Sequence, residues 1–437
     1  MKKEKKNFIW NVIGLSFNAF ISFFLLIIVK RINGIDLAGI FTYAFSLSCL
    51  FYISCCFYSR TFQVSDYKNE FLFKDYFVSR LIFDIINLII VLLFSFVSGF
   101  DSFKILVIGL LMIYKCIEAL CDSIFGQMQK EGNLYRTGIS YTLKSIIGMI
   151  VFLIIDLFTN NLILSISGLI IINTLVLFLY DIPSLKEKFP RLNFNKEKFL
   201  KLLLVSFPVF IYTFLQNYLS NSQKVVMTYF IDNDLQTIFG ILIMPATMLI
   251  LVGNYIILPF INDLTNKFKN KDYKSFNKIV NKMCISLLLI GALCVLIAFF
   301  LGIPVLNFIY NINLEQYKYL LLIILAGSIF NALSMVFSNV LTVLTVNKRQ
   351  TIIYIVMSIV CTGITICLAH YYGMEGLCYS YSLTVTLLSI IYFFVYKLYI
   401  RKIEKQLHWY KNNVVFIFNF IIVWLSKYQK FVIIYIA

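Results

Sequence analysis

Long apolar runs follow one another along nearly the whole chain, with short polar segments between them. Each run has about 20 residues, the length at which an α-helix crosses the hydrocarbon core of a bilayer. We therefore predict an all-α polytopic membrane protein with about twelve transmembrane helices. The predicted spans are residues 8–29, 38–59, 77–98, 103–127, 138–156, 162–182, 200–223, 236–261, 280–302, 317–346, 350–371 and 375–397.

The span at residues 103–127 breaks the apolar pattern. Lys115, Glu118 and Asp122 lie in its middle, at positions i, i+3 and i+7. At about 100° per residue the three side chains share one helix face, close to the bilayer midplane. A charge at this depth costs several kcal/mol in lipid, so the face is expected to meet protein or a water-filled cavity.

A charged segment at residues 183–199 divides the spans into two sets of six. We expect an N-terminal lobe at 1–182, a cytoplasmic linker at 183–199 and a C-terminal lobe at 200–400. A basic cytoplasmic segment with a short apolar tail is expected at 401–437. Because each lobe has an even number of spans, both would have the same orientation and enclose a cavity between them.

Short repeats support this duplication. Residues 36–41 (DLAGIF) are similar to residues 234–239 (DLQTIF), and the KDY sequence at 74–76 recurs at 271–273. Each pair lies in equivalent positions of the two halves and has nearly the same separation. The sequence therefore predicts two pseudo-symmetric six-helix bundles.

Composition agrees with a membrane protein, since 60% of the residues are hydrophobic and the mean hydropathy is +0.87. The net charge of +17 is unevenly distributed. If the N-terminus is cytoplasmic, the outer segments hold only five of the 38 lysines and arginines, namely Lys30, Arg31, Lys104, Lys224 and Lys318. This pattern predicts a cytoplasmic N-terminus in a multi-pass plasma membrane protein. It indicates attraction to membrane lipids and argues against nucleic acid as a partner.

Catalytic and metal chemistry are not indicated by the polar residues. The ten cysteines are scattered without a CxxC pair, and neither His370 nor His408 has an obvious partner. We expect packing roles for the cysteines, no metal site and no cofactor.

Several segments resemble polysaccharide flippases of the Wzx, or O-antigen transporter, type. They are WNVIGLSFNAFISFFLLIIVKRINGIDLAGIF, RTFQVSD followed by DYFVSR, EALCDSIFGQMQKEG, FPVFIYTFLQNYLSNSQKVV and IFGILIMPA, and the similarity covers residues 1–400. These flippases share a superfamily with MATE multidrug exporters and the lipid II flippase. The resemblance implies a two-lobed, twelve-helix fold and alternating access. It also implies an undecaprenyl-diphosphate-linked oligosaccharide as substrate, moved to the outer leaflet by an ion gradient.

By this resemblance, the positions of interest are Arg60, Gln63, Asp66, Arg80, Glu118, Asp122, Gln127 and Lys224. A diphosphate headgroup needs fixed cations inside the bilayer, and the candidate ligands are Lys115, Lys144, Lys224, Arg60 and Arg80. Candidate residues for contacting sugar or lining the lumen are Asn11, Asn18, Gln216 and Asn217. Buried carboxylates that could carry a coupling ion are Glu118, Asp122 and Asp84.

Structural roles stay open for the same residues. Lys115 could simply neutralise Glu118, and Asp122 could pair with Lys144 on the next span. Lys224 could extend to the membrane interface. Loop residues Arg60, Asp66 and Arg80 could cap helices and connect the second span to the third.

Two other functions are compatible with the composition. A MATE-type multidrug or cation antiporter would favour an acid inside the first span, and this chain has none there. A polytopic glycan polymerase or ligase would need a sizeable outer loop with catalytic residues, and the predicted outer loops are short. We therefore expect a transporter and not an enzyme. Its expected partners are lipid-linked oligosaccharide, membrane lipids and the glycan polymerase or glycosyltransferases of the same pathway.

Overall fold

The computed structural model describes residues 3–57, 60–66, 70–186, 189, 193–257, 260–270, 272–344 and 346–405. These residues are almost entirely helical and contain no strand. A helix pairs all of its backbone polar groups internally, which is the requirement that a hydrocarbon environment imposes. The predicted all-α class is confirmed.

The helices in the first half are α1 (Lys3–Asn33), α2 (Ile35–Cys55), α3 (Arg60–Ser65), α4 (Phe73–Val97), α5 (Ser102–Lys130), α6 (Leu134–Thr159) and α7 (Leu162–Val176), which a π-helical turn extends to Asp181. Those in the second half are α8 (Lys196–Val226), α9 (Asn233–Ile257), α10 (Phe260–Lys269), α11 (Tyr273–Ile297), α12 (Ile303–Tyr310), α13 (Lys318–Val343) and α14 (Asn347–Lys405). A π-helical turn at Ala298–Gly302 joins α11 to α12.

Every predicted span corresponds to a helix. Among the described residues, ten segments are long and apolar enough to cross a membrane. Helix α5 is absent from these ten because of the charges in its centre, and α14 counts once although Gly373 breaks it. The backbone of Gly373 has a φ of 53°, so two helices meet there, between the two predicted spans. The sequence did not predict α3, α10 or α12, which are too short to span.

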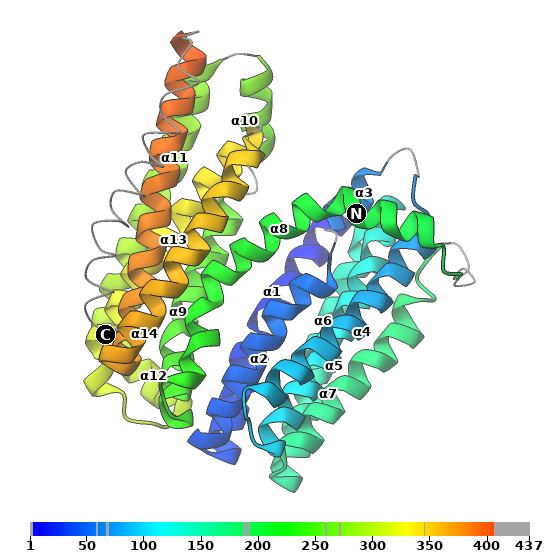
Figure 1. The fold of residues 1–437 in the computed structure, drawn as a ribbon, viewed down its shortest axis with the longest axis vertical. Coiled ribbons are helices and arrows are strands. Elements are labelled where there is room, and N and C mark those ends of the chain that lie inside the picture. Colours follow the sequence, from blue (N-terminus) through cyan, green and yellow to red (C-terminus); the bar gives the residue numbers. More distant parts are fainter. Residues whose placement is uncertain are drawn as a thin grey trace.

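The helices form two lobes, with α1–α7 in one and α9–α14 in the other (Figure 1). In the N-terminal lobe, α1 and α7 pack on α6, while α2 and α4 pack on α5. In the C-terminal lobe, α13 packs on α9, α11 and α14. Helix α8 contacts α2 and α4 as well as α14, and so connects the lobes. The exact lobe boundaries given above remain predictions.

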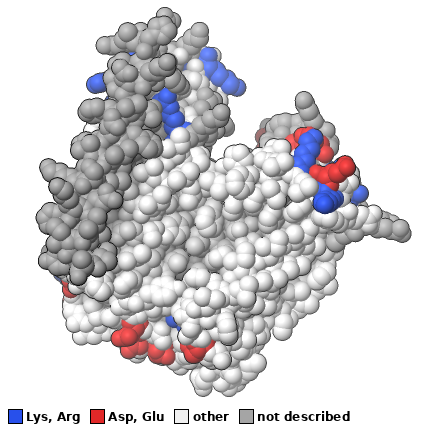
Figure 2. Space-filling model, in the orientation of Figure 1, with Lys and Arg blue, Asp and Glu red and all other residues white. Residues whose placement is uncertain are grey.

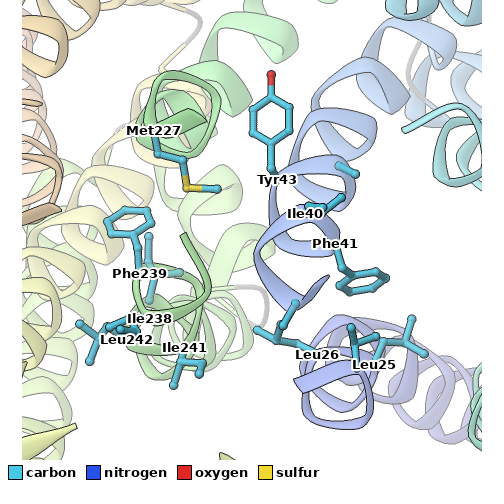
Figure 3. Packing of buried hydrophobic residues seen from close by; sticks show 14 of the residues in the cluster. Leu25, Leu26, Ile40, Phe41, Tyr43, Met227, Ile238, Phe239, Ile241 and Leu242 are labelled. Carbon is cyan, nitrogen blue, oxygen red and sulfur yellow. The ribbon is translucent and has the colours of Figure 1, made fainter. Parts of the chain in front are cut away.

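The lobes are in contact at one end of the molecule, where α2 packs on α9. One buried apolar cluster continues from α1 and α2 into α9, α12 and α13, and Figure 3 shows the side chains of α1, α2 and α9 around this contact. The amide of Asn233 donates to the carboxylate of Asp36 at 2.8 Å, and the hydroxyl of Thr237 donates to the carbonyl of Ile35 at 2.6 Å. The first turns of α2 and α9, which carry the repeated DLxxIF sequence, therefore meet here.

Basic residues of α1 add to this closed end. Lys30 donates to the backbone carbonyl of Asn311 at 2.6 Å, and Arg31 donates to the carbonyls of Ile309 and Phe308. These carbonyls lie at the C-terminus of α12, the end of a helix dipole that attracts cations. The contacts fasten the N-terminal lobe to the C-terminal lobe.

The opposite end, where the N-terminus lies, is hollowed between the lobes (Figure 2). On the face shown, basic residues lie mainly at this end, whereas acidic residues lie at both ends. This distribution agrees with the predicted cytoplasmic N-terminus, which remains a prediction.

Candidate functional site

The charged face of α5 points toward α2. Lys115 and Glu118 form an ion pair of 2.6 Å, with both side chains largely buried. The ammonium group of Lys115 also lies 4.9 Å from the ring centre of Phe45 and 5.6 Å from that of Tyr52, both on α2. The i, i+3 pairing considered from sequence is therefore present, and aromatic rings cover the cation.

Asp122 binds two arginines and not Lys144, so the pairing of Asp122 with Lys144 considered from sequence is wrong. Arg80 of α4 lies 2.8 Å from the Asp122 carboxylate, and Arg60 of α3 lies 3.7 Å away. These two contacts hold α3 and α4 against α5. A second carboxylate, that of Asp84 on α4, also lies within electrostatic reach of Arg80.

Lys144 of α6 forms an ion pair with Asp181 at the end of α7, and it lies 2.8 Å from the thiol of Cys121. Asp181 is fully buried and Lys144 nearly so. Because this pair lies inside the N-terminal lobe, it connects α6 to α7 and is neutral as a unit. Its geometry indicates a structural role.

Lys224 is half-buried near the C-terminus of α8 and differs from the buried cations Lys115 and Lys144. It has no hydrogen bond or ion pair with any residue that the structure describes. The thiol of Cys49 on α2 lies within electrostatic reach of both Lys224 and Lys115. Two cations from the two halves of the chain thus converge on the middle of α2.

The polar residues of α8 lie on the same side as Lys224. Gln216 and Asn217 precede Lys224 by about two helical turns, and both are half-buried. The Asn217 amide donates to the backbone carbonyl of Thr213 at 2.9 Å. The sugar-contacting or lumen-lining role of Gln216 and Asn217 remains a prediction.

The predicted polar residues of α1 separate into two environments. Asn18 lines a small cavity of about 10 Å³ within the N-terminal lobe, together with Glu118 and Lys144. A cavity of this size has room for about one water molecule. Asn11 instead lies where α1 packs closely on α6, beside Gly138. The lumen-lining role of both residues remains a prediction.

The segment between α2 and α4 is fastened by polar contacts. Gln63 of α3 is fully buried and donates to the carbonyl of Ser123 on α5 at 3.0 Å. Asp66 accepts hydrogen bonds from the backbone of Glu70 and Phe71, each at 3.0 Å. Burial acts to raise the pKa of Asp66, but these donors outweigh it and hold the pKa below its usual range. Asp66 thus holds the loop before α4 and does not cap a helix, since α4 begins at Phe73 with Leu72 as its N-cap.

Asp84 of α4 lies apart from the basic residues that converge on α2. Its nearest ligand-forming neighbours are Cys55 and Cys116, and the ligand atoms of the three lie within 4.8 Å of one another. Sequence reasoning missed this cluster because its members come from three helices and follow no spacing rule. The sequence predicts only packing roles for the cysteines and no metal site. This cluster has the residue types and the spacing that could hold a metal ion.

No protein-family model matches the chain. The capsular polysaccharide biosynthesis protein CapF of Staphylococcus aureus is 23% identical over 400 residues, covering 90% of this chain and 99% of CapF. The lipid II flippase MurJ, in an inward closed conformation, superposes with a TM-score of 0.70 at 15% identity, covering 90% of each chain. An inward-facing multidrug resistance transporter of the MATE family superposes with a TM-score of 0.62 at 14% identity, covering 92% of this chain and 95% of the transporter.

The likeness to these solved structures confirms the predicted two-lobed helical fold. The ten candidate spans among the described residues indicate a protein that crosses the membrane several times.

Proposed function

We propose that this chain, which has the fold shared by MATE transporters and the lipid II flippase, is a polysaccharide flippase. Its substrate is an undecaprenyl-diphosphate-linked oligosaccharide, which it moves from the cytoplasmic to the outer leaflet by alternating access. The name of the relative CapF, a capsular polysaccharide biosynthesis protein, supports a role in surface glycan assembly.

One observation carries the proposal: Lys115 of α5 and Lys224 of α8 both lie within electrostatic reach of Cys49 on α2. A headgroup held by both ammonium groups would contact α5 of the N-terminal lobe and α8, the helix that connects the lobes. Lys224 has no carboxylate partner among the described residues. A cation without a partner inside a bilayer is costly unless an anion joins it, and a diphosphate supplies that anion.

The neighbouring charges extend this basic surface. Arg60 and Arg80 both lie beside Asp122, and Asp84 lies within electrostatic reach of Arg80. A diphosphate approaching from the hollowed end would meet these two guanidinium groups before it reaches Lys115. Attraction of this kind concentrates an anionic headgroup inside a solvated passage.

The shape of the molecule fits the first step of such a cycle. The hollowed end lies on the predicted cytoplasmic side, where the substrate is made, and the other end is closed by α2 and α9. The headgroup enters between the lobes while the polyprenyl chain stays in lipid, so the charges never cross hydrocarbon. Closing the hollow and separating α2 from α9 would then release the headgroup outside.

Ion coupling is assigned to Glu118. Its carboxylate pairs with Lys115 and also lines the small cavity inside the N-terminal lobe. Glu118 therefore contacts both the proposed diphosphate ligand and this cavity. Proton or cation binding to Glu118 would free Lys115 to bind diphosphate. Asp122 suits this role less well because two arginines hold it.

Lys224→Ala and Lys115→Ala test the site in cells that lack the native chain. Each variant should insert in the membrane but abolish surface glycan, while lipid-linked intermediate accumulates on the cytoplasmic leaflet. Lys282→Ala is the matched control, because Lys282 is an exposed cation of α11. Wild-type glycan in both site variants would refute the assignment.

The same cells distinguish the alternatives. Export of cationic dyes with unchanged surface glycan would favour a multidrug antiporter. Formation of glycan linkages by the purified chain would favour a polymerase or ligase. The proposal predicts neither result.

A further inference from the structure

We propose that Cys55, Asp84 and Cys116 form a binding site for a soft divalent metal ion of the Zn²⁺ class. The three residues lie on α2, α4 and α5 of the N-terminal lobe. This site lies beside two of the basic residues assigned to the headgroup, because Cys116 follows Lys115 and Asp84 lies within electrostatic reach of Arg80.

The geometry of the cluster is close to that of a metal site. The two sulfur atoms and a carboxylate oxygen are buried and lie within 4.8 Å of one another. In a tetrahedral zinc site with bonds of about 2.0–2.3 Å, ligand atoms are about 3.5–3.8 Å apart. The side chains therefore need to move by about 1 Å or less per ligand to enclose an ion. The Cys116 thiol already donates to the backbone carbonyl of Asp84 at 3.7 Å, which fixes α5 beside α4.

The carboxylate of Asp84 provides the second observation. Asp84 is only 5% exposed, and neither carboxylate oxygen accepts a hydrogen bond from a described residue. A buried carboxylate without a partner is strongly disfavoured. Arg80, one turn earlier on α4, is bound to Asp122. A cation between Asp84 and the two thiols would remove the penalty.

The ligand types select the ion. Thiolates prefer soft metal ions such as Zn²⁺ and Cd²⁺, whereas Mg²⁺ and Ca²⁺ prefer oxygen ligands alone. On binding, each thiol loses its proton to solvent, so two protons are released per ion. Three protein ligands leave a fourth position for water or for the second oxygen of Asp84.

The expected consequence follows from the helices that supply the ligands. All three belong to the N-terminal lobe, so a bound ion would connect α2 to α4 and α5 without bridging the lobes. Metal binding should therefore raise the thermal stability of the folded chain and leave alternating access free.

The test uses the full-length chain, purified in detergent and stripped of metal, with Cd²⁺ as the probe. Wild type should bind one Cd²⁺ per chain with the ultraviolet absorption of thiolate–cadmium bonds. Cys55→Ser, Cys116→Ser and Asp84→Asn should each weaken binding by about tenfold or more. Cys361→Ser and Cys378→Ser are matched controls, because both cysteines are buried in the C-terminal lobe, and they should bind like wild type.

X-ray absorption of the wild-type chain tests the metal site without any variant, and so does not depend on whether the variants fold. X-ray absorption of the Zn²⁺-loaded chain should show two sulfur ligands at about 2.3 Å together with oxygen ligands at about 2.0–2.2 Å. Failure of wild type to bind Cd²⁺ or Zn²⁺ would overturn the proposal and leave a proton as the occupant of Asp84. Equal Cd²⁺ binding by wild type and the Cys55 and Cys116 variants would also overturn it.

Discussion

Replacing Gly39 with alanine should open the closed end of the transporter. Gly39 lies in α2 where this helix meets α9, and a β-carbon there would lie 2.0 Å from the backbone carbonyl oxygen of Asn233. Ordinary van der Waals contact begins at 3.4 Å. The obstacle is backbone, which cannot rotate away as a side chain can. The two helices must therefore separate by more than about 1 Å.

The size of the expected shift in the conformational equilibrium follows from the location of the clash. Overpacking a close contact costs about 1–3 kcal/mol. In our account, this cost falls only on the state in which α2 and α9 are packed together, since they separate when the other state forms. The equilibrium between the two states should therefore shift by about 5–150-fold toward opening at this end.

A cysteine introduced at a buried position of the closed end can report the shift in this equilibrium. Thr237 of α9 is fully buried and donates to the carbonyl of Ile35, so Thr237→Cys should react slowly with a membrane-impermeant thiol reagent added from outside. The background carries Cys367→Ser, which removes the exposed native cysteine. Adding Gly39→Ala should raise the labelling rate by about fivefold or more.

Two glycine variants serve as controls. They distinguish separation of α2 from α9 from a general loss of stability. Gly14→Ala creates a comparable clash, 2.2 Å from the carbonyl oxygen of Gly138, but inside the N-terminal lobe. Gly363→Ala meets no atom within 4 Å. Neither control should raise labelling of Thr237→Cys. Unchanged labelling in Gly39→Ala, or an equal increase in Gly14→Ala, would refute the reasoning.

Three further variants test individual residues. Lys144→Met should destabilise the chain by about 3–5 kcal/mol because it leaves Asp181 buried without a cation, and adding Asp181→Asn should restore most of the loss in thermal unfolding. Lys224→Ala should leave the melting temperature unchanged yet reduce surface glycan about tenfold or more, as measured by quantitative glycan staining, because this cation has no partner to lose. Asp66 has a lowered pKa, so its stabilisation is complete above about pH 4 and is lost as pH falls through the folded-state pKa. Asp66→Asn should lower the melting temperature at neutral pH and remove that part of its acid dependence.

Much of the fold was predictable because membrane helices follow one strong rule. Runs of about 20 apolar residues have to become helices in a bilayer, so all twelve spans were located. The charged face of α5 was predictable for the same reason, because helical spacing alone places Lys115, Glu118 and Asp122 on one side. Short helices such as α3 and α12 escape this rule, since they do not cross the membrane.

The partners of the charged residues could not be predicted from spacing. Asp122 binds Arg80, which is 42 residues away in sequence, and Lys144 binds Asp181, which is 37 residues away. The convergence of Lys115 and Lys224 on α2 depends on how α8 crosses between the lobes. No local pattern contains that information, because it depends on the packing of whole helices.

The most direct measurement of the central claim is transport by the purified chain in liposomes. An undecaprenyl-diphosphate-linked oligosaccharide is placed in the membrane, and its appearance in the opposite leaflet is followed with an impermeant glycan-cleaving enzyme. We predict transfer by wild type and by Lys282→Ala, with loss in Lys115→Ala and Lys224→Ala. Equal transfer by all four proteins, or none by wild type under an imposed ion gradient, would contradict a flippase that holds diphosphate between its lobes.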